Sequence, residues 1–360
     1  MSAPLPNSGL PLAGRYEAKE WIGAGGMQNV FLALDTYFGR KVALKTPKDG
    51  AGNKRFSASA TVSARINQSN VAKTLDYFVV EDRPFLVEEF VEGEDLSATM
   101  KRGIPYLPPT ACARVLHQLA KGLAASHHAD VVHRDLKPSN IMIVGGLKFL
   151  EAKITDFGIA KMAADEIGSW DGKGSTTSKT ILGAIPYMAP ESISDFKKSD
   201  KASDVWAIAA IVYELMSGTC PFGTGLLAIP AILAAVPPSA PAQIFGSQFR
   251  ALGGDVFSIL LACMSKDPLL RPNADDLVKM CEKLCYGIEA YETGQVSKNH
   301  SAAVGFISAD KGGDLMYHRD SFYGDNTRDV GTALWYARHP GGGNDRAFPI
   351  IVLANTKPSK

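Results

Sequence analysis

HRDLKPSN occupies residues 133–140 of the chain, with DFG following at 156–158 and APE at 189–191. Upstream, IGAGGMQNV at 22–30 separates two stretches of alternating apolar residues, and VALK follows at 42–45. A glycine-rich hairpin lets backbone N–H groups approach phosphate oxygens, and a lysine on the next strand holds phosphates as a point charge. The glycine-rich turn alone is a weak signal, but HRDLKPSN, DFG and APE following it in this order are very improbable by chance. The series therefore indicates phosphate chemistry.

In these motifs the chain resembles the eukaryotic-like (Hanks-type) protein kinases, and most of all the bacterial serine/threonine kinases. The resemblance implies an α+β, bilobal fold, with a small β-rich N-lobe, a larger helical C-lobe and ATP between them. It also implies transfer of the ATP γ-phosphoryl group to Ser and Thr hydroxyls of proteins, autophosphorylation included. We expect a flexible lead-in over residues 1–13, the kinase domain over 14–288 and a second domain over 293–356.

Hydrophobic periodicity agrees with two lobes. Alternating patterns predict strands at 17–22, 30–35 and 41–46, followed by one helix. From residue 96 onward helical spacing dominates, and Thr110 is expected to cap the first long helix after Pro108 and Pro109. Further helices are expected at 202–217, 255–265 and 273–286.

The composition argues against several partners. The 360 residues carry 38 Lys+Arg against 37 Asp+Glu, so no bulk charge favours DNA, an anionic membrane or an acidic substrate. Apolar runs at 205–213 and 226–236 fall short of the ~20 residues of a membrane helix, and the N-terminus lacks a secretory signal pattern. The five scattered cysteines, without a CxxC pair, fit reduced thiols. We therefore expect a cytoplasmic protein without membrane contact.

The resemblance assigns a role to each polar residue of the catalytic motifs. Asp135 would orient the substrate hydroxyl and accept its proton, and Lys137, typical of the serine/threonine form, would stabilise the transferring phosphoryl group. Asn140 and Asp156 would hold two Mg²⁺ ions, and Lys45 would hold the phosphates of ATP. ATP and Mg²⁺ are therefore the expected cofactors.

The segment FLVEEFVEGEDL at 85–96 corresponds to the hinge between the lobes. The resemblance places backbone groups of Glu89 and Val91 against adenine, and Asp95 near the ribose. Further implied ATP contacts are Ile22, Gly23, Gly25, Val30, Ala43 and Met142. For the apolar residues in this set, the sequence does not distinguish packing in the core from packing against adenine.

Several charged residues are expected to be structural instead. By resemblance, Glu191 and Arg271 form a buried ion pair, and Asp204 holds the backbone of the catalytic loop. His133 is expected to be a core residue under that loop rather than an acid or base.

The chain departs from the family in three places. Gln28 stands where the family usually keeps its third glycine, so the hairpin would approach phosphate less closely. Ala184 stands where a threonine usually hydrogen-bonds the catalytic aspartate and lysine. Losing that hydrogen bond would cost about 1–3 kcal/mol of transition-state stabilisation. The helix that should present a glutamate to Lys45 has Ser59 instead, and no acid occurs from residue 50 to 75.

Glu88 offers a replacement for the missing glutamate. It stands at a position that is normally apolar in this family, on a strand expected to lie beside that of Lys45. A cation in a partly desolvated cleft needs a fixed carboxylate, so we predict that Glu88 pairs with Lys45 and serves catalysis. The alternative is a Glu88 that points to solvent, as an acid in a Glu–Glu pair most often does.

Phosphorylation is expected between DFG and APE, where Arg134 could bond a loop phosphate. The candidate sites are Ser175, Thr176, Thr177, Ser178 and Thr180. The alternative is that this Gly/Ser/Thr stretch is simply a mobile loop.

Residues 294–354 read as five short strands with glycine turns, which suggests a small barrel. The pattern resembles a cold-shock domain, an OB-fold, with GFI at 305–307 and DLMYH at 314–318 as its nucleic-acid-binding strands. Only Phe306 and His318 clearly match the stacking residues, and the charge from residue 293 onward is only mildly basic. We expect weak binding of single-stranded nucleic acid at most, and favour regulation of the kinase or a protein contact.

Two functions from different classes remain. The intact HRD, Asn140 and DFG set favours an active serine/threonine kinase with protein substrates. Ser59 and Ala184 favour a nucleotide-binding pseudokinase that acts as a scaffold or sensor. The physiological substrate and the oligomeric state, a homodimer included, stay open.

Overall fold

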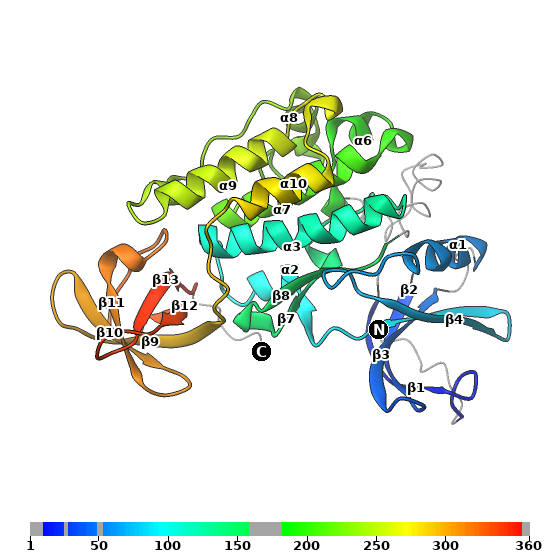
Figure 1. Cartoon of the computed structure of the whole chain (residues 1–360), viewed down its shortest axis with the longest axis horizontal. Coiled ribbons are helices and arrows are strands. Elements are labelled where there is room, and N and C mark those ends of the chain that lie inside the picture. Colours follow the sequence, from blue (N-terminus) through cyan, green and yellow to red (C-terminus); the bar gives the residue numbers. More distant parts are fainter. Residues whose placement is uncertain (1–9, 25–27, 49–52, 158–181, 355–360) are drawn as a thin grey trace.

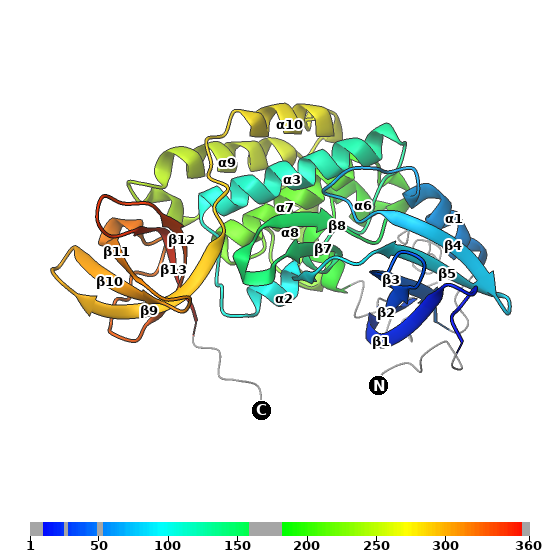
Figure 2. The same cartoon turned by 60° about the horizontal axis from the view of Figure 1, so that its bottom comes forward.

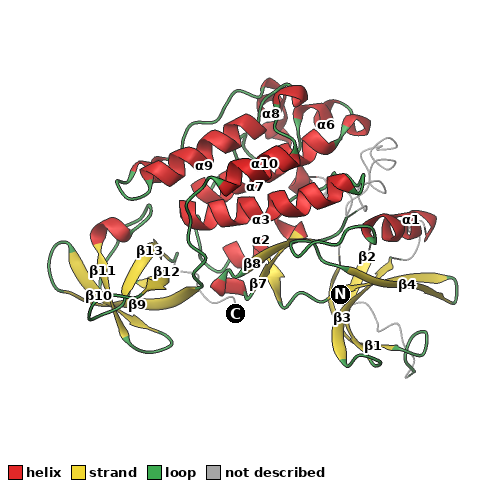
Figure 3. Cartoon of the chain, in the orientation of Figure 1, coloured by secondary structure: helices red, strands yellow, loops and turns green. Residues whose placement is uncertain are grey.

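The computed structural model describes residues 10–24, 28–48, 53–157 and 182–354. Three parts follow one another along the longest axis: a small sheet lobe, a helical lobe and a small β-structure (Figure 1). The turned view keeps the helical lobe between the other two (Figure 2). Strands therefore dominate both ends of the molecule and helices its middle (Figure 3).

The N-lobe is a five-stranded antiparallel sheet in the order β1-β2-β3-β5-β4, with helix α1 beside it. Alternating apolar side chains such as Phe31 and Val42 form its core, so the predicted strands and helix are confirmed. Leu12 is also buried there and donates its N–H to the carbonyl of Tyr16. The elements are β1 Tyr16–Ala24, β2 Gln28–Asp35, β3 Arg40–Pro47, α1 Asn53–Ser63, β4 Thr74–Val80 and β5 Arg83–Glu89.

The C-lobe is built around two long helices, α3 and α7, whose buried faces form one apolar core. The expected cap at Thr110 is wrong: α3 starts at Pro109 with Pro108 as its N-cap, because the fixed φ of proline suits the first helical turn. None of the helices in the described ranges is long and apolar enough to cross a bilayer. The helices are α2 Leu96–Met100, α3 Pro109–His128, α6 Pro190–Ser194, α7 Lys201–Ser217, α8 Ile229–Ala234, α9 Arg250–Cys263 and α10 Ala274–Glu282.

A three-stranded sheet, β6-β7-β8, lies at the side of the C-lobe that faces the N-lobe. Its strands are β6 Gly93–Asp95, β7 Ile141–Val144 and β8 Glu151–Ile154. The short turn η1, Pro138–Asn140, leads into β7, and Asp156 follows β8. This sheet therefore brings the HRDLKPSN and DFG motifs together.

The C-terminal part is a closed five-stranded barrel in the order β10-β11-β13-β12-β9. The predicted five strands are confirmed, and the first begins at Tyr291, before the predicted stretch of 294–354. Gly305 of the GFI motif is required, because a Cβ there would lie 2.3 Å from the Tyr317 hydroxyl oxygen. The strands are β9 Tyr291–Asn299, β10 Val304–Ala309, β11 Asp314–His318, β12 Ala333–His339 and β13 Arg346–Val352.

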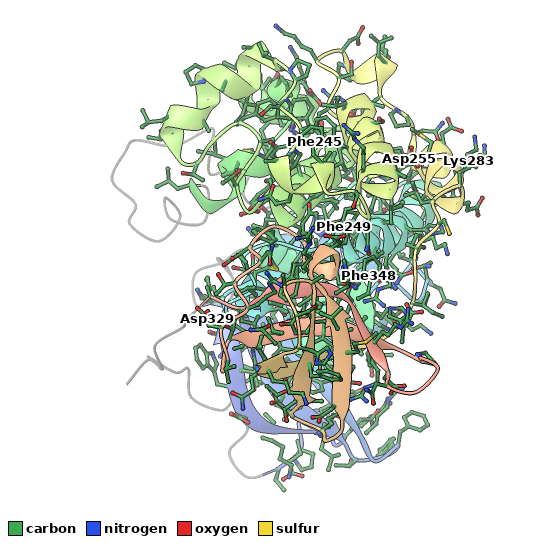
Figure 4. All side chains as sticks on the ribbon, turned by 90° about the vertical axis from the view of Figure 1, so that its left-hand side faces the viewer. Phe245, Phe249, Asp255, Lys283, Asp329 and Phe348 are labelled. Carbon is green, nitrogen blue, oxygen red and sulfur yellow. The ribbon has the colours of Figure 1, made fainter. Side chains whose placement is uncertain are left out.

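Aromatic side chains join the barrel to the C-lobe. Trp335 is fully buried, stacks on Tyr291 at 3.8 Å between ring centroids, and donates its indole N–H to the carbonyl of Leu147 at 2.7 Å. Phe249 of the C-lobe stacks on Phe348 of the barrel at 5.5 Å, where the two parts meet in Figure 4. The apolar core of the C-lobe therefore continues into the face of the barrel that packs on it, while the barrel interior holds a separate apolar cluster.

Candidate active site

One face of the N-lobe sheet gathers the residues of the phosphate and adenine region. Strand β3 pairs with its neighbours so that Ala43 lies opposite Glu88, and Lys45 opposite Leu86 and Val30. Directly opposite residues in antiparallel strands share a face, as do residues two apart along a strand. Val30, Ala43, Lys45 and Glu88 therefore point to the same side of the sheet.

Lys45 contacts two carboxylates on this face. Its Nζ lies 2.5 Å from Oε2 of Glu88 and 2.7 Å from Oδ1 of Asp156. Lys45 and Glu88 are both buried, so Glu88 does not point to solvent. Helix α1 instead contacts the sheet through Phe56 and Ala60 against Leu86.

Burial and charge set the protonation of this cluster. Burial acts to lower the pKa of Lys45, but the carboxylates of Asp156 and Glu88 outweigh it and raise that pKa above its usual value. Burial raises the pKa of Glu88 in spite of Lys45. Burial also acts to raise the pKa of Asp156, but Lys45 and a hydrogen bond from Gln28 bring it below its usual value. Lys45 and Asp156 are therefore a charged pair at neutral pH.

The side chain of Gln28 also enters the site. Its Nε2 donates to Oδ1 of Asp156 at 2.8 Å, and the residue is only 3% exposed. The sequence drew attention to this position because a glycine is usual there, but no signal in the sequence indicated the contact with Asp156.

The catalytic-motif side chains surround Asp135. Lys137 donates from Nζ to Oδ2 of Asp135 at 2.7 Å, and Nδ2 of Asn140 donates to the Asp135 carbonyl at 2.7 Å. Because Nδ2 is used in this way, the amide oxygen of Asn140 remains as its acceptor. A hard cation such as Mg²⁺ prefers carboxylate and amide oxygens, so Asn140 and the ionised Asp156 fit such an ion.

Buried contacts fix the backbone of the catalytic loop. Asp204 accepts hydrogen bonds from the backbone N–H groups of His133 and Arg134, both at 2.8 Å. The ring of Phe157 packs against that of His133 at 4.7 Å. These contacts agree with the structural roles expected for Asp204 and His133.

A second buried contact lies next to the loop. Arg271 donates two hydrogen bonds to the Glu191 carboxylate, at 2.6 and 2.9 Å, as expected from the resemblance. Ala184 is buried and lines a small cavity with Asp135, where its methyl group supplies no hydrogen bond.

The residues expected to contact ATP lie on several strands of the two lobes. Asp95 lies opposite Met142 in the β6–β7 pair, and its side chain accepts from the N–H of Ala98 as the cap of α2. Glu89 ends β5 with its carboxylate 2.7 Å from Nζ of Lys153, and Val91 is buried just beyond. Ile22 is partly exposed on β1, and Gly23 follows it.

Some expected residues lie outside the described part. These are Gly25 and the sites Ser175, Thr176, Thr177, Ser178 and Thr180, while for Ser59 only the backbone in α1 is described. Arg134, the expected partner of a loop phosphate, has a buried Nε without a hydrogen-bond partner in the described residues.

The barrel residues expected to contact nucleic acid lie on neighbouring strands. Phe306 on β10 pairs with Met316 on β11, and Nζ of Lys298 lies 5.0 Å from the centre of the Phe306 ring. His318 is exposed at the end of β11. The C-lobe contacts of Trp335 and Phe348 come from β12 and β13 instead.

A cleft of about 440 Å³ separates the C-lobe from the barrel beside β6. Charged residues of both parts line it: Glu94, Arg102, Lys148, Glu292 and Lys311. No local sequence pattern indicates this cleft, because the residues that line it come from segments far apart in the chain.

Comparisons with known proteins agree with this geometry. A family model described as protein kinase domain matches residues 16–281. The chain is 32% identical over 269 residues to the probable serine/threonine-protein kinase PknB of Corynebacterium glutamicum, covering 71% of this chain and 40% of that protein. It is 36% identical over 235 residues to the serine/threonine-protein kinase PknA of Mycobacterium tuberculosis (62% and 52%).

A third relative aligns over more of the chain. The serine/threonine-protein kinase pkn2 of Myxococcus xanthus is 29% identical over 341 residues, which cover 92% of this chain and 40% of that protein. The chain thus spans about half or less of the length of these curated relatives.

Proposed function

The chain belongs to the protein kinase family, and we propose that it is an active serine/threonine protein kinase that uses ATP and Mg²⁺. The curated relatives that support the serine/threonine class are kinases by name. The observation that carries the proposal is the contact of Lys45 with both Glu88 and Asp156, since it supplies the carboxylate that helix α1 lacks.

In the proposed reaction, Asp135 orients the hydroxyl of a protein Ser or Thr and accepts its proton as the phosphoryl group is transferred. Lys137, 2.7 Å from Asp135, places a positive charge beside the position of transfer. Lys45 holds the phosphates, and Glu88 keeps its ammonium group oriented. Asn140 and Asp156 hold Mg²⁺, which neutralises the charge of the phosphates when it is bound.

Adenine binding in this proposal uses the hinge. Backbone groups of Glu89 and Val91 contact the base, which packs between Val30 and Ala43 on one side and Met142 on the other. In this proposal Ile22 and Gly23 of β1 cover the base, and Asp95 lies at the ribose end, while Gly25 lies outside the described residues.

Intact-mass spectrometry after incubation with Mg-ATP tests the proposal. We expect mass increments of phosphate on the wild-type chain and almost none on Asp135→Asn, because that variant cannot accept the hydroxyl proton. Nucleotide binding should survive in the variant. Equal phosphorylation of the two proteins, or none of either together with no transfer to a Ser/Thr substrate, would contradict the kinase proposal.

Two observations favour the second candidate, a nucleotide-binding pseudokinase scaffold. Gln28 fills space beside the metal residue Asp156, and Ala184 leaves Asp135 without the usual threonine. Such a protein would bind ATP without transfer, so the same experiment would find no added phosphate on it.

We further propose that the barrel is a cold-shock-like module of OB type that acts together with the kinase lobes. Its shared core with the C-lobe supports coupled behaviour, and the cleft beside β6 borders the strand that carries Asp95. Phe306 and His318, on strands other than those of Trp335 and Phe348, are left for weak contact with single-stranded nucleic acid. A cytoplasmic location and a homodimer stay predictions from the sequence.

A further inference from the structure

Gln28 begins strand β2 at the base of the glycine-rich loop. It lies two residues before Val30, so its side chain points to the same face as Val30 and Lys45. A glycine at this position would leave that space open, whereas the glutamine side chain is buried at 3% exposure.

The two donors on Asp156 come from the N-lobe. Nε2 of Gln28 and Nζ of Lys45 both donate to Oδ1, at 2.8 and 2.7 Å, so neither occupies Oδ2. Asp156 itself follows the end of β8 in the C-lobe and has a left-handed backbone, with φ at 63°. Such a conformation costs about 1–3 kcal/mol and persists only where neighbouring contacts hold it. Gln28 supplies one of those contacts.

The amide oxygen of Gln28 differs from the amide N–H in its hydrogen bonding. Within the described residues, Oε1 of Gln28 is buried and has no hydrogen-bond partner. A buried acceptor without a donor costs about 1–3 kcal/mol, so a donor that arrives on binding would recover that cost. Mg²⁺ keeps several of its waters when a protein binds it, and those waters are donors.

We propose that Gln28 is a positioning residue for the metal site: its N–H fixes Asp156, and its amide oxygen accepts from the hydration shell of the metal. This inference rests on the proposed function of Asp156 as a metal ligand. Through this one side chain, metal binding is coupled to the contact between strand β2 of the N-lobe and Asp156 of the C-lobe. The opposite effect is a plug, in which Gln28 competes with the metal for Asp156. The two effects change metal affinity in opposite directions, since positioning by Gln28 strengthens metal binding and competition weakens it.

The test measures Mn²⁺ binding by electron paramagnetic resonance, with ATP present and with Asp135→Asn in every protein to prevent turnover. The variants are Gln28→Gly, which restores the usual residue, and Gln28→Met, which keeps the volume of the side chain but removes both polar atoms. Asn29→Ala is the matched control, since it removes an amide from the next residue, on the opposite face of the strand. All proteins are full-length, and calorimetry gives their ATP affinity without metal.

We expect both Gln28 variants to bind Mn²⁺ about tenfold more weakly, the effect of one lost hydrogen bond to a charged group, with metal-free ATP affinity within twofold of the control. Unchanged Mn²⁺ affinity in Gln28→Met would refute the positioning role, and tighter binding would establish the plug. If the parent protein binds ATP and Mn²⁺ while the variants match it, only this inference fails. If the parent binds neither, the proposed function fails with it.

Discussion

Replacing Glu88 with glutamine removes the negative charge beside Lys45 while keeping the shape of the side chain. In the native protein Oε2 of Glu88 lies 2.5 Å from Nζ of Lys45, and both side chains are buried. Glutamine still offers an amide oxygen to Nζ. The change therefore tests the charge rather than the packing.

The contacts of Lys45 set the size of the effect. Removing one partner of an isolated buried ion pair costs about 3–5 kcal/mol. Lys45 keeps Asp156 at 2.7 Å, so the loss should approach that of one charge-assisted hydrogen bond, about 1.5–3 kcal/mol. If that loss applies in the transition state, kcat/KM falls about 10- to 100-fold.

The assay is a steady-state measurement of phosphate transfer to a Ser/Thr peptide as ATP is varied. Glu92→Gln is the matched control, because Glu92 pairs with Lys41 at 3.2 Å and both side chains are largely exposed. Adding Ser59→Glu to Glu88→Gln should restore part of the rate by returning a carboxylate to helix α1. A Glu88→Gln protein with wild-type rate and ATP affinity would refute the reasoning.

Four further results are expected. Peptide mapping of active protein should find phosphate on the Ser/Thr cluster between DFG and APE, and Arg134→Ala should lower the rate of phosphorylated protein only. Trp335→Ala should lower stability by about 3–5 kcal/mol in thermal unfolding and change the kinase rate, because it leaves a cavity between barrel and C-lobe. Binding of a single strand should be weak, salt-sensitive and reduced by Phe306→Ala in a fluorescence titration; nanomolar binding at physiological salt would contradict this. The raised pKa of Glu88 means that protonation of Glu88 stabilises the folded protein as pH falls, because it removes a buried charge. The lowered pKa of Asp156 has the opposite effect, because protonation of Asp156 removes its stabilising contact with Lys45. Glu88→Gln lacks the first effect, so its melting temperature should fall more steeply with decreasing pH than that of the wild type.

Local structure was predictable wherever one segment carries its own signal. The β-strands of the N-lobe follow from alternation, and α7 follows from apolar residues between a capping aspartate, Asp200, and a left-handed glycine, Gly218. The start of α3 was misplaced because two adjacent prolines, Pro108 and Pro109, both suit a helix start, and the rule for capping side chains favoured Thr110.

Contacts that depend on strand register were harder to predict. The approach of Glu88 to Lys45 was inferred from charge, but the reason that it can occur is the pairing of Ala43 with Glu88. The Gln28–Asp156 hydrogen bond joins residues 128 positions apart, and no local pattern specifies it. The face of the barrel that packs on the C-lobe could not be predicted either. The sequence does not distinguish the buried Trp335 from an exposed aromatic residue that stacks on a base.

Gln28 and Glu88 both stand where the family usually has another residue, and both are polar side chains on strands of the N-lobe sheet. Lys45, Glu88 and Gln28 belong to adjacent strands whose register is fixed by backbone hydrogen bonds, so their relative positions do not depend on helix α1. Helix α1 contacts this sheet through apolar packing of Phe56 on Leu86 and has no acid in its sequence. Moving α1 would therefore leave the ion pair of Lys45 intact. Control of the rate must then act on Asp156 or on the C-lobe that carries it, which is the lobe whose core continues into the barrel.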